Sequence, residues 1–278
     1  MKKIFYMFFL LWGVVLCAET KVEKKETNAT IPVVEKVEVE VKKAIAATRG
    51  DIKVIEASEN IRYLSQKMVK DYLFFYKHQN KVEVKRGLER ALLKLNDNFR
   101  IIATTTKDTD TKDVLEFLAY SKDQIEQIFN EKADEERVAL MLDYSETLLE
   151  GADSISNAHK YDFSDEEKML MVTKEMEYLL ERVTKYYMAI NVGFDSTTNK
   201  DQMLESISDL EKNIAEINRY TYPAELQKAQ VKMNESWKAN KRFFDQSETL
   251  FIPKLIFISV DYLEDVVLQI ALYHSKNQ

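Results

Sequence analysis

The sequence predicts an all-α protein, built as two tandem up-and-down four-helix bundles. Its 278 residues include only five Gly and three Pro, and they combine 45% hydrophobic with 31% charged residues. This composition is typical of long amphipathic helices joined by short connections. Beyond the N-terminal stretch, apolar residues recur at helical spacing and no run of alternating strands is found. In addition, one helical segment recurs 115 positions later in the chain.

The recurring segment covers residues 54–76 and returns at 169–191. The first copy has its apolar stripe at Val54, Ala57, Ile61, Leu64, Met68, Tyr72 and Phe75. The same stripe in the second copy falls at Met169, Val172, Met176, Leu179, Val183, Tyr187 and Ile190. Outside the stripe, the offset also relates Tyr63 to Tyr178, Lys70 to Lys185 and His159 to His274. Because one offset holds from residue 54 to residue 159, the pattern predicts a duplicated helical module.

The N-terminus has the layout of a secretory signal peptide over residues 1–18. Two lysines precede an apolar run over residues 4–16, and Ala18 offers a small residue for cleavage. The run is shorter than the roughly 20 residues that a spanning helix needs, so an uncleaved anchor is the less favoured alternative. A lipoprotein modified at Cys17 is also disfavoured, because bulky Leu16 precedes the cysteine. The predicted location is therefore the periplasm.

Residues 19–48 predict a flexible charged linker. They are rich in Lys, Glu, Val and Thr, and the alternating Val37, Val39 and Val41 have no partner strand nearby. Cleavage of the signal peptide removes two lysines and changes the net charge from −7 to −9. This negative charge argues against a nucleic-acid partner. The single cysteine leaves with the signal peptide, so no disulfide is expected.

From residue 49 onward the pattern divides into eight helical segments. The first bundle, 49–160, is predicted to contain helices over 51–79, 83–105, 110–131 and 135–159. The second bundle, 161–278, is predicted to contain helices over 165–195, 200–219, 223–246 and 253–275. Four helices joined by short loops are expected to pack as an antiparallel bundle.

Several of these boundaries have a local chemical cause. Ser164 and Glu167 form a capping box, in which the hydroxyl and the carboxylate each accept a hydrogen bond from a free backbone N–H. Pro223 and Pro253 stand where the first helical turn tolerates a missing N–H.

Catalytic and metal sites find no support in the motifs. His78, His159 and His274 are the only histidines, and none belongs to the Glu-x-x-His pair of di-iron bundles. No His-Glu-x-x-His or paired-Cys motif and no Gly-rich phosphate loop is present. His159 and His274 occupy equivalent helix ends, where a cation suits the helix dipole. We therefore expect a non-catalytic protein without a metal or cofactor.

One short stretch is similar to a known family. Arg62, Leu64, Ser65, Gln66, Lys67, Met68, Lys70 and Tyr72 resemble the signature at the start of PilJ-type sensor domains, the N-terminal domains of type IV pilus chemotaxis transducers. The match covers about fifteen residues, and elsewhere mainly helix count and spacing agree. The resemblance implies a helical sensor domain that acts as a parallel dimer joined through its first helices. In related nitrate and nitrite sensors, the corresponding Arg contacts the anion between subunits.

The same helix carries a second stripe beside its core stripe. Arg62, Ser65 and Gln66 form its polar part, and Val69, Leu73 and Tyr76 form its apolar part. The polar part is a candidate site for a small anion, because a guanidinium offers forked donors. The apolar part is a candidate docking face for another bundle. The alternative is that Arg62 pairs with a carboxylate on a neighbouring helix.

The second copy departs from the family pattern at the candidate site. Glu177 and Leu180 replace Arg62 and Ser65, so the second bundle lacks an anion site of this kind. The two bundles could lie side by side, like the family's parallel dimer, in which case Arg62 approaches Glu177 and pairs with it. The competing arrangement is end to end. The chain is then a monomer with pseudo-dimeric repeats or a homodimer.

Two functions follow from these observations. The first is an exported, non-catalytic, sensor-like module that binds a small anion or metabolite, a membrane receptor or sensor kinase, or both. The alternative is a structural or adaptor protein of the cell envelope with no small-molecule ligand.

Overall fold

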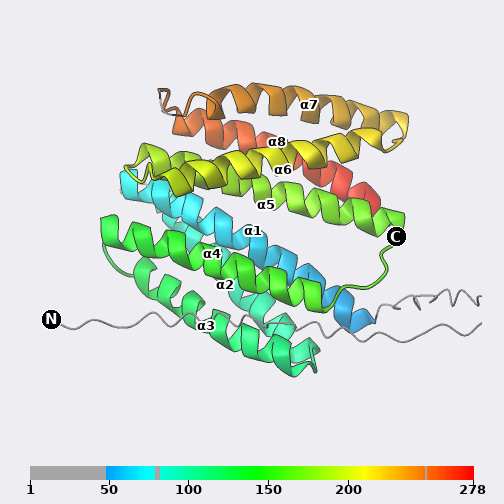
Figure 1. Ribbon diagram of the computed structural model, residues 1–278, viewed down its shortest axis with the longest axis horizontal. Coiled ribbons are helices and arrows are strands. Elements are labelled where there is room, and N and C mark those ends of the chain that lie inside the picture. Colours follow the sequence, from blue (N-terminus) through cyan, green and yellow to red (C-terminus); the bar gives the residue numbers. More distant parts are fainter. Residues whose placement is uncertain (1–47, 79–81, 248) are drawn as a thin grey trace, which may run out of the picture. The chain divides into compact units, whose positions relative to one another are not determined.

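The computed structural model describes residues 48–78, 82–247 and 249–278, which form eight α-helices and no strand (Figure 1). The all-α prediction is confirmed. The helices are α1 (Arg49–Lys77), α2 (Val82–Thr105), α3 (Thr109–Phe129), α4 (Glu135–Ala158), α5 (Asp165–Asn191), α6 (Thr197–Arg219), α7 (Ala224–Phe244) and α8 (Pro253–Lys276). The signal peptide predicted at 1–18 and the linker predicted at 19–48, apart from Thr48, lie outside the described residues.

Local chemistry explains where the leading helices begin and end. Thr48 caps α1 and Ser164 caps α5, each in a capping box with the acidic residue three positions later. The predicted helix over 165–195 stops early, at Asn191. Two residues further on, Gly193 adopts a φ of 110°, a conformation that ends the helix and that residues with a side chain rarely adopt.

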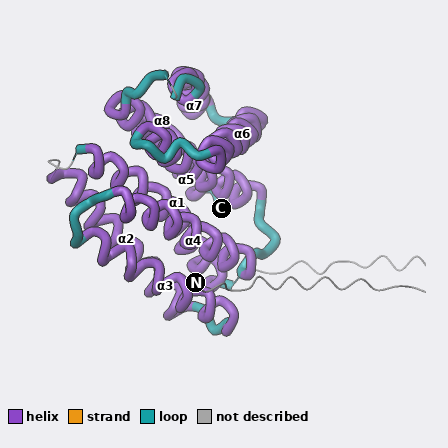
Figure 2. The backbone as a smooth tube through the Cα atoms, turned by 60° about the vertical axis from the view of Figure 1, so that its left-hand side comes forward, coloured by secondary structure: helices purple, strands orange, loops and turns teal. Residues whose placement is uncertain are grey.

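The helices pack in two sequential groups of four. We call α1–α4 the first repeat and α5–α8 the second repeat. In the first repeat α1 packs on α2 and α4, and α3 packs on α4 and more lightly on α2. The second repeat has the same pattern, with α5 on α6 and α8, and α7 on α8 and more lightly on α6. Figure 2 shows the two groups meeting along α1 and α5.

The repeats lie side by side, with their first helices parallel. The Arg62 guanidinium stands over the Tyr178 ring, and further along both helices Lys67 pairs with Glu181. Because the contacts advance in the same direction on α1 and α5, the two helices run parallel. Of the two arrangements considered from the sequence, the structure shows the side-by-side one and not the end-to-end one.

The predicted core stripes face the interior in both repeats. Ile61, Met68 and Tyr72 of α1 are buried, as are Met176 and Tyr187 of α5. Among the described helices, none has the length and apolarity needed to cross a membrane.

Candidate functional site

Arg62, the centre of the predicted anion site, already has carboxylate partners. Its Nη1 lies 2.7 Å from Glu59 Oε2 on α1, and its Nη2 lies 3.8 Å from Asp153 Oδ1 on α4. Its Cζ is 4.2 Å from the centre of the Tyr178 ring, which covers one face of the guanidinium. The expected pair with Glu177 does not form, since Glu177 pairs with Lys174. The alternative prediction is that Arg62 pairs with a carboxylate on a neighbouring helix, and Asp153 of α4 is such a carboxylate.

Ser65 and Gln66 do not complete an open site beside Arg62. Both are fully buried. The Ser65 hydroxyl donates to the Arg62 carbonyl at 2.7 Å, and Gln66 Nε2 donates to Ser65 Oγ at 3.0 Å. Gln66 Nε2 also lies 3.4 Å from the Ser145 carbonyl of α4. Ser65 and Gln66 are thus bonded inside the protein, with Gln66 Oε1 left without a partner, and they do not form the predicted surface for a small anion.

The predicted docking face is covered by the chain's own second repeat. Val69 and Leu73 are fully buried in the core, and Tyr76 is half-buried against it. The next residue, Phe74, packs against Phe257 of α8 with ring centres 4.9 Å apart. The apolar part of the stripe is therefore buried inside the chain, on the helix that meets the second repeat.

A buried charge cluster lies between the repeats on the α1 side. Lys70 is fully buried, and its Nζ lies 2.7 Å from Glu181 Oε2 of α5, which also pairs with Lys67 at 2.8 Å. Burial acts to raise the pKa of Glu181, but the charges of Lys70 and Lys67 outweigh it and hold that pKa below its ordinary value. Asp261 of α8 stands 4.0 Å from Lys70.

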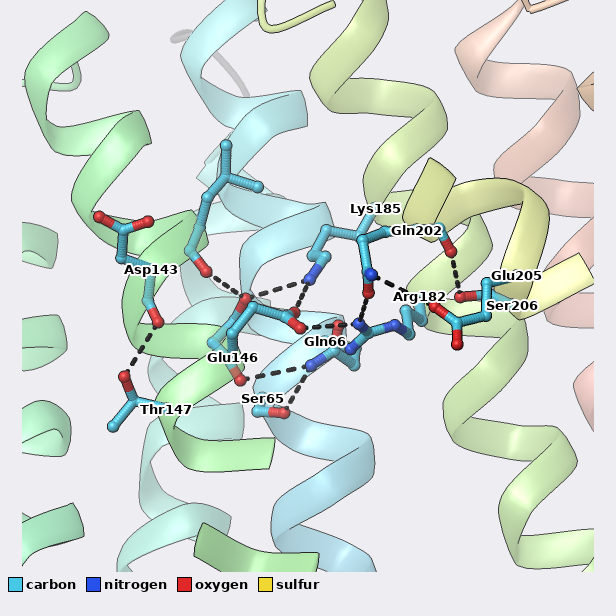
Figure 3. Close-up of polar contacts among 12 residues, drawn as sticks. Ser65, Gln66, Asp143, Glu146, Thr147, Arg182, Lys185, Gln202, Glu205 and Ser206 are labelled. Atoms are coloured by element: carbon cyan, nitrogen blue, oxygen red, sulfur yellow. Dashed lines mark hydrogen bonds and ion pairs between the residues drawn. The ribbon is translucent and has the colours of Figure 1, made fainter. Parts of the chain in front are cut away.

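A second cluster occupies the equivalent place on the α5 side. Figure 3 shows Lys185 and Arg182 reaching from α5 to Glu146 of α4. Lys185 Nζ also donates to Ser145 Oγ at 3.2 Å. Burial lowers the pKa of Lys185 to about 8, because Glu146 offsets only part of that cost and Arg182 adds to it.

Two matched histidine contacts tie the ends of each repeat. His159 Nδ1 lies 2.8 Å from Asp51 Oδ1, and His274 Nδ1 lies 2.5 Å from Glu166 Oε2. Both partners, like both histidines, are separated by 115 positions. The sequence placed the histidines at helix ends but did not assign these partners, although the offset between Asp51 and Glu166 was available as a signal. Hydrogen bonds hold the pKa of both carboxyls below their ordinary values, chiefly from His159 to Asp51 and from Tyr220 to Glu166.

A cavity of about 530 Å³ lies where the two repeats meet. Its walls come from two helices of each repeat, α1, α2, α5 and α8. The lining residues are Asn60, Tyr63, Leu64, Lys94, Asp97, Asn98, Lys174, Glu177, Glu264, Asp265 and Leu268. We call this cavity the junction pocket. None of its residues was nominated from the sequence, because the pocket exists only once α1 and α5 are placed together.

Two carboxylates in the junction pocket are incompletely satisfied. Glu264 Oε2 accepts a hydrogen bond from the Tyr63 hydroxyl at 3.3 Å, and Glu177 Oε2 pairs with Lys174 at 2.8 Å. The other oxygen of each carboxylate is buried and has no hydrogen-bond partner. Burial raises the pKa of Glu264 well above its ordinary value, and the negative charge of Glu181 raises it further.

Within the described part of the chain, no three His, Cys, Asp or Glu side chains are grouped so that they could hold a metal ion. Comparison with protein-family models, curated proteins and solved structures finds no match for this chain.

Proposed function

We propose that this protein is an exported, non-catalytic, sensor-like module that binds a small molecule between its two repeats. The junction pocket is the observation that supports it. Its volume of about 530 Å³ lies within the range of small-molecule sites, roughly 300–1,000 Å³. Because α1, α2, α5 and α8 all contribute walls, an occupant touches both repeats at once. Binding is therefore coupled to the packing of one repeat against the other.

The parallel contact between α1 and α5 supports the proposed relation to PilJ-type sensor domains. The resemblance implied a parallel dimer joined through first helices, and this chain holds its two first helices in that way. We place the ligand site in the junction pocket and not at Arg62, because Glu59 and Asp153 already balance the charge of Arg62. A ligand signal would leave through a membrane receptor or sensor kinase that contacts the repeats.

A thermal-shift screen of residues 19–278 against a library of small metabolites tests the proposal. A ligand that binds only the folded state at 100 times its Kd adds about 2.7 kcal/mol of stability. We expect at least one compound to raise Tm, and Leu268→Trp, which fills the junction pocket, to abolish the rise. Leu255→Trp is the matched control, because Leu255 is similarly exposed on α8 and does not line the pocket. A library without a single hit, or hits insensitive to Leu268→Trp, would refute the proposed site.

An adaptor role is the second candidate, and one surface feature favours it. Leu255, Ile258 and Tyr262 form an exposed apolar stripe on α8, with Ile258 69% exposed. The equivalent positions on α4 include Asp143 and Thr147, so the stripe is specific to the second repeat. Exposed apolar stripes of this kind are typical of protein contacts. A photo-crosslinker at position 258 should then give one discrete adduct in cells, which Tyr262→Asp abolishes, while the screen finds no ligand.

A further inference from the structure

The two repeats treat one pair of equivalent tyrosines differently. Tyr178 of α5 lies beneath the guanidinium of Arg62, whose Cζ is 4.2 Å from the ring centre. Glu59 and Asp153 hold that guanidinium in place. In one half of the molecule, an aromatic ring and two carboxylates thus enclose a cation that the protein itself supplies. This combination of ring face and carboxylates is well suited to a cation.

The equivalent place in the other half is the junction pocket. Tyr63 corresponds to Tyr178 by the offset of 115, and Glu177 corresponds to Arg62. The residue that supplies the cation in one half is therefore a carboxylate in the other. The nearest positive group to the Tyr63 ring is Lys67, whose Nζ is 5.7 Å from the ring centre, near the outer limit of about 6 Å for such contacts. Lys67 is itself already paired with Glu181 at 2.8 Å.

The charges that line the junction pocket leave it negative. Four carboxyl groups face two lysines there, so the lining stays negative even when burial keeps Glu264 protonated, and a bound cation would favour the ionised form of Glu264. One of the two, Lys174, pairs with Glu177 and occupies only one of its oxygens. The remaining oxygens of Glu177 and Glu264 are buried without a hydrogen-bond partner, an arrangement that costs free energy until a donor arrives. An anion would meet the same oxygens with repulsion.

The apolar part of the pocket wall indicates what else the occupant carries. Leu64 and Leu268 line the same cavity as the two carboxylates. A bare inorganic cation would make no apolar contact with this wall, whereas a short hydrocarbon stem would cover the exposed side chain of Leu268. The volume of about 530 Å³ admits a molecule larger than a single ion.

We infer that the junction pocket binds a small organic cation, with an ammonium or guanidinium group on Glu177 and Glu264 and a short apolar stem against Leu64 and Leu268. The cationic group of the ligand then lies in the pocket that Tyr63 lines, and Tyr63 is the counterpart of the ring that Arg62 covers. At the counterpart ring, Tyr178, the cation is supplied by Arg62 of the chain itself. This inference rests on the proposed function and names its ligand class.

Calorimetric titration of residues 19–278 tests the inference. The cationic probes are propylamine, 1,4-diaminobutane and agmatine, and the matched probes without positive charge are 1-propanol, 1,4-butanediol and glutarate. We expect at least one cationic probe to bind and its uncharged or anionic counterparts to give no heat. Glu264→Gln and Glu177→Gln should each weaken binding about tenfold or more, because each removes a charge-assisted hydrogen bond. Glu235→Gln is the matched control, because Glu235 is an exposed carboxylate of α7 that does not line the pocket, and it should change the affinity less than threefold.

The outcomes separate this inference from the proposed function. Binding of 1,4-butanediol or glutarate that Leu268→Trp blocks would overturn the cation assignment and leave the ligand-binding function intact. Cation binding that survives both glutamine substitutions would also overturn it. If neither the probes nor any library compound binds, both proposals fail. Circular dichroism of each glutamine variant establishes that it retains the helical fold before its affinity is interpreted.

Discussion

Lys70 and Lys185 occupy equivalent positions in the two repeats, and both side chains are fully buried. Their pKa values nevertheless move in opposite directions. Burial lowers the pKa of both, but Glu181 and then Asp71 outweigh burial at Lys70 and raise its pKa above the ordinary value. At Lys185 the pKa falls to about 8, since Glu146 compensates only in part. Burial is the same at the two sites, so the neighbouring charges decide the result.

The difference traces to one pair of equivalent positions. Glu181 of α5 lies between Lys67 and Lys70 of α1. The equivalent residue on α1 is Gln66, which is neutral and leaves Arg182 and Lys185 to share Glu146. One carboxylate is therefore present on one side of the pseudo-symmetric interface and absent from the other. Two structurally equivalent sites can thus differ in electrostatics without a change of fold.

The largest effect is expected from Glu181→Gln. Removing one partner of a buried ion pair leaves an uncompensated charge and typically costs about 3–5 kcal/mol. Lys70 would then be buried without its closest carboxylate. Glu146→Gln should cost less, because the pKa of Lys185 is already lowered to about 8 and its proton is therefore lost more easily when the carboxylate is removed. Urea unfolding of both variants at pH 7 measures the two costs, and an equal or reversed order would contradict the comparison.

The stability of Glu181→Gln at acid pH tests whether the lost charge causes its destabilisation. The pKa of Glu181 is lower in the folded state than its ordinary value of 4.5. Its stabilising contribution is therefore present above pH 4.5 and is lost as the pH falls below that value. The stability gap between wild type and Glu181→Gln should narrow over this acid range. A gap that stays constant would show that the loss comes from packing rather than from charge.

Gly151 marks a second difference between the repeats. A Cβ added to Gly151 of α4 would lie 2.5 Å from a side-chain atom of Leu118 on α3, whereas the equivalent residue of α8 is the buried Val266. We expect Gly151→Ala to destabilise the protein by about 1–3 kcal/mol, the usual cost of overpacking. The control is Gly87→Ala in α2, where a Cβ meets nothing within 4 Å. That change should stabilise by about 0.5–1 kcal/mol, because Gly is a poor helix former. Denaturant unfolding distinguishes the two variants, because their midpoints should move in opposite directions while the slope m stays the same. Stabilisation by both substitutions would mean that α3 and α4 are not in close contact.

The two matched histidine contacts should differ less in how much each contributes to the stability of the fold. The His274 side chain is fully buried and bonds to Glu166 and Tyr222, while His159 is 11% exposed. We expect His274→Leu to cost about 1–2 kcal/mol from lost hydrogen bonds, and His159→Leu to cost less. Thermal unfolding at pH 7 measures both. Because the pKa of Asp51 and of Glu166 is lowered, each contact stabilises above the ordinary pKa of its carboxyl and weakens as the pH falls below it. Variants that lose stability in parallel with wild type over that range would contradict this role.

Much of the fold could be predicted because local patterns determine it. The spacing of apolar residues located all eight helices, and the Ser164–Glu167 capping box placed the start of α5. The predicted end at residue 195 is too late, although Gly193 was available as a signal, because glycine commonly ends a helix. Helix spacing, capping and turn residues act within a few positions of one another, so one sequence is enough to read them.

The candidate site depends on which helix faces meet, and that information is not local. The helical spacing places Arg62 outside the core stripe, but its contacts with Asp153 and Tyr178 emerge only when α1, α4 and α5 are placed together. Glu177 was noted as the counterpart of Arg62, yet its role as a wall of the junction pocket required α8 beside α1. The duplication shows which positions are equivalent in the two repeats, but the packing of the helices determines which groups each residue contacts.

The smallest stability effect is expected from Gln66→Glu, which restores the missing carboxylate beside Arg182 and Lys185. The attraction gained and the cost of burying a further charge largely cancel, so stability at pH 7 should change by no more than about 1 kcal/mol. The pKa of Lys185, however, should rise above its present value of about 8. NMR titration of the Lys185 side chain measures that shift directly, and Lys185→Met identifies its signal.

The change in stability with pH above about 8 gives a second test of how the residue at position 66 affects the pKa of Lys185. In the wild type, the folded-state pKa of Lys185, about 8, lies below its ordinary 10.5, so the unfolded chain binds more protons between these values. Wild-type stability should therefore rise with pH from about 8 to 9.5, below the range where tyrosines begin to ionise. In Gln66→Glu the folded-state pKa moves toward 10.5 and the rise should flatten, as it should in Lys185→Met. A rise that persists unchanged in Gln66→Glu would mean that the residue at position 66 does not control the charge on Lys185, and that the two halves of the interface differ for another reason.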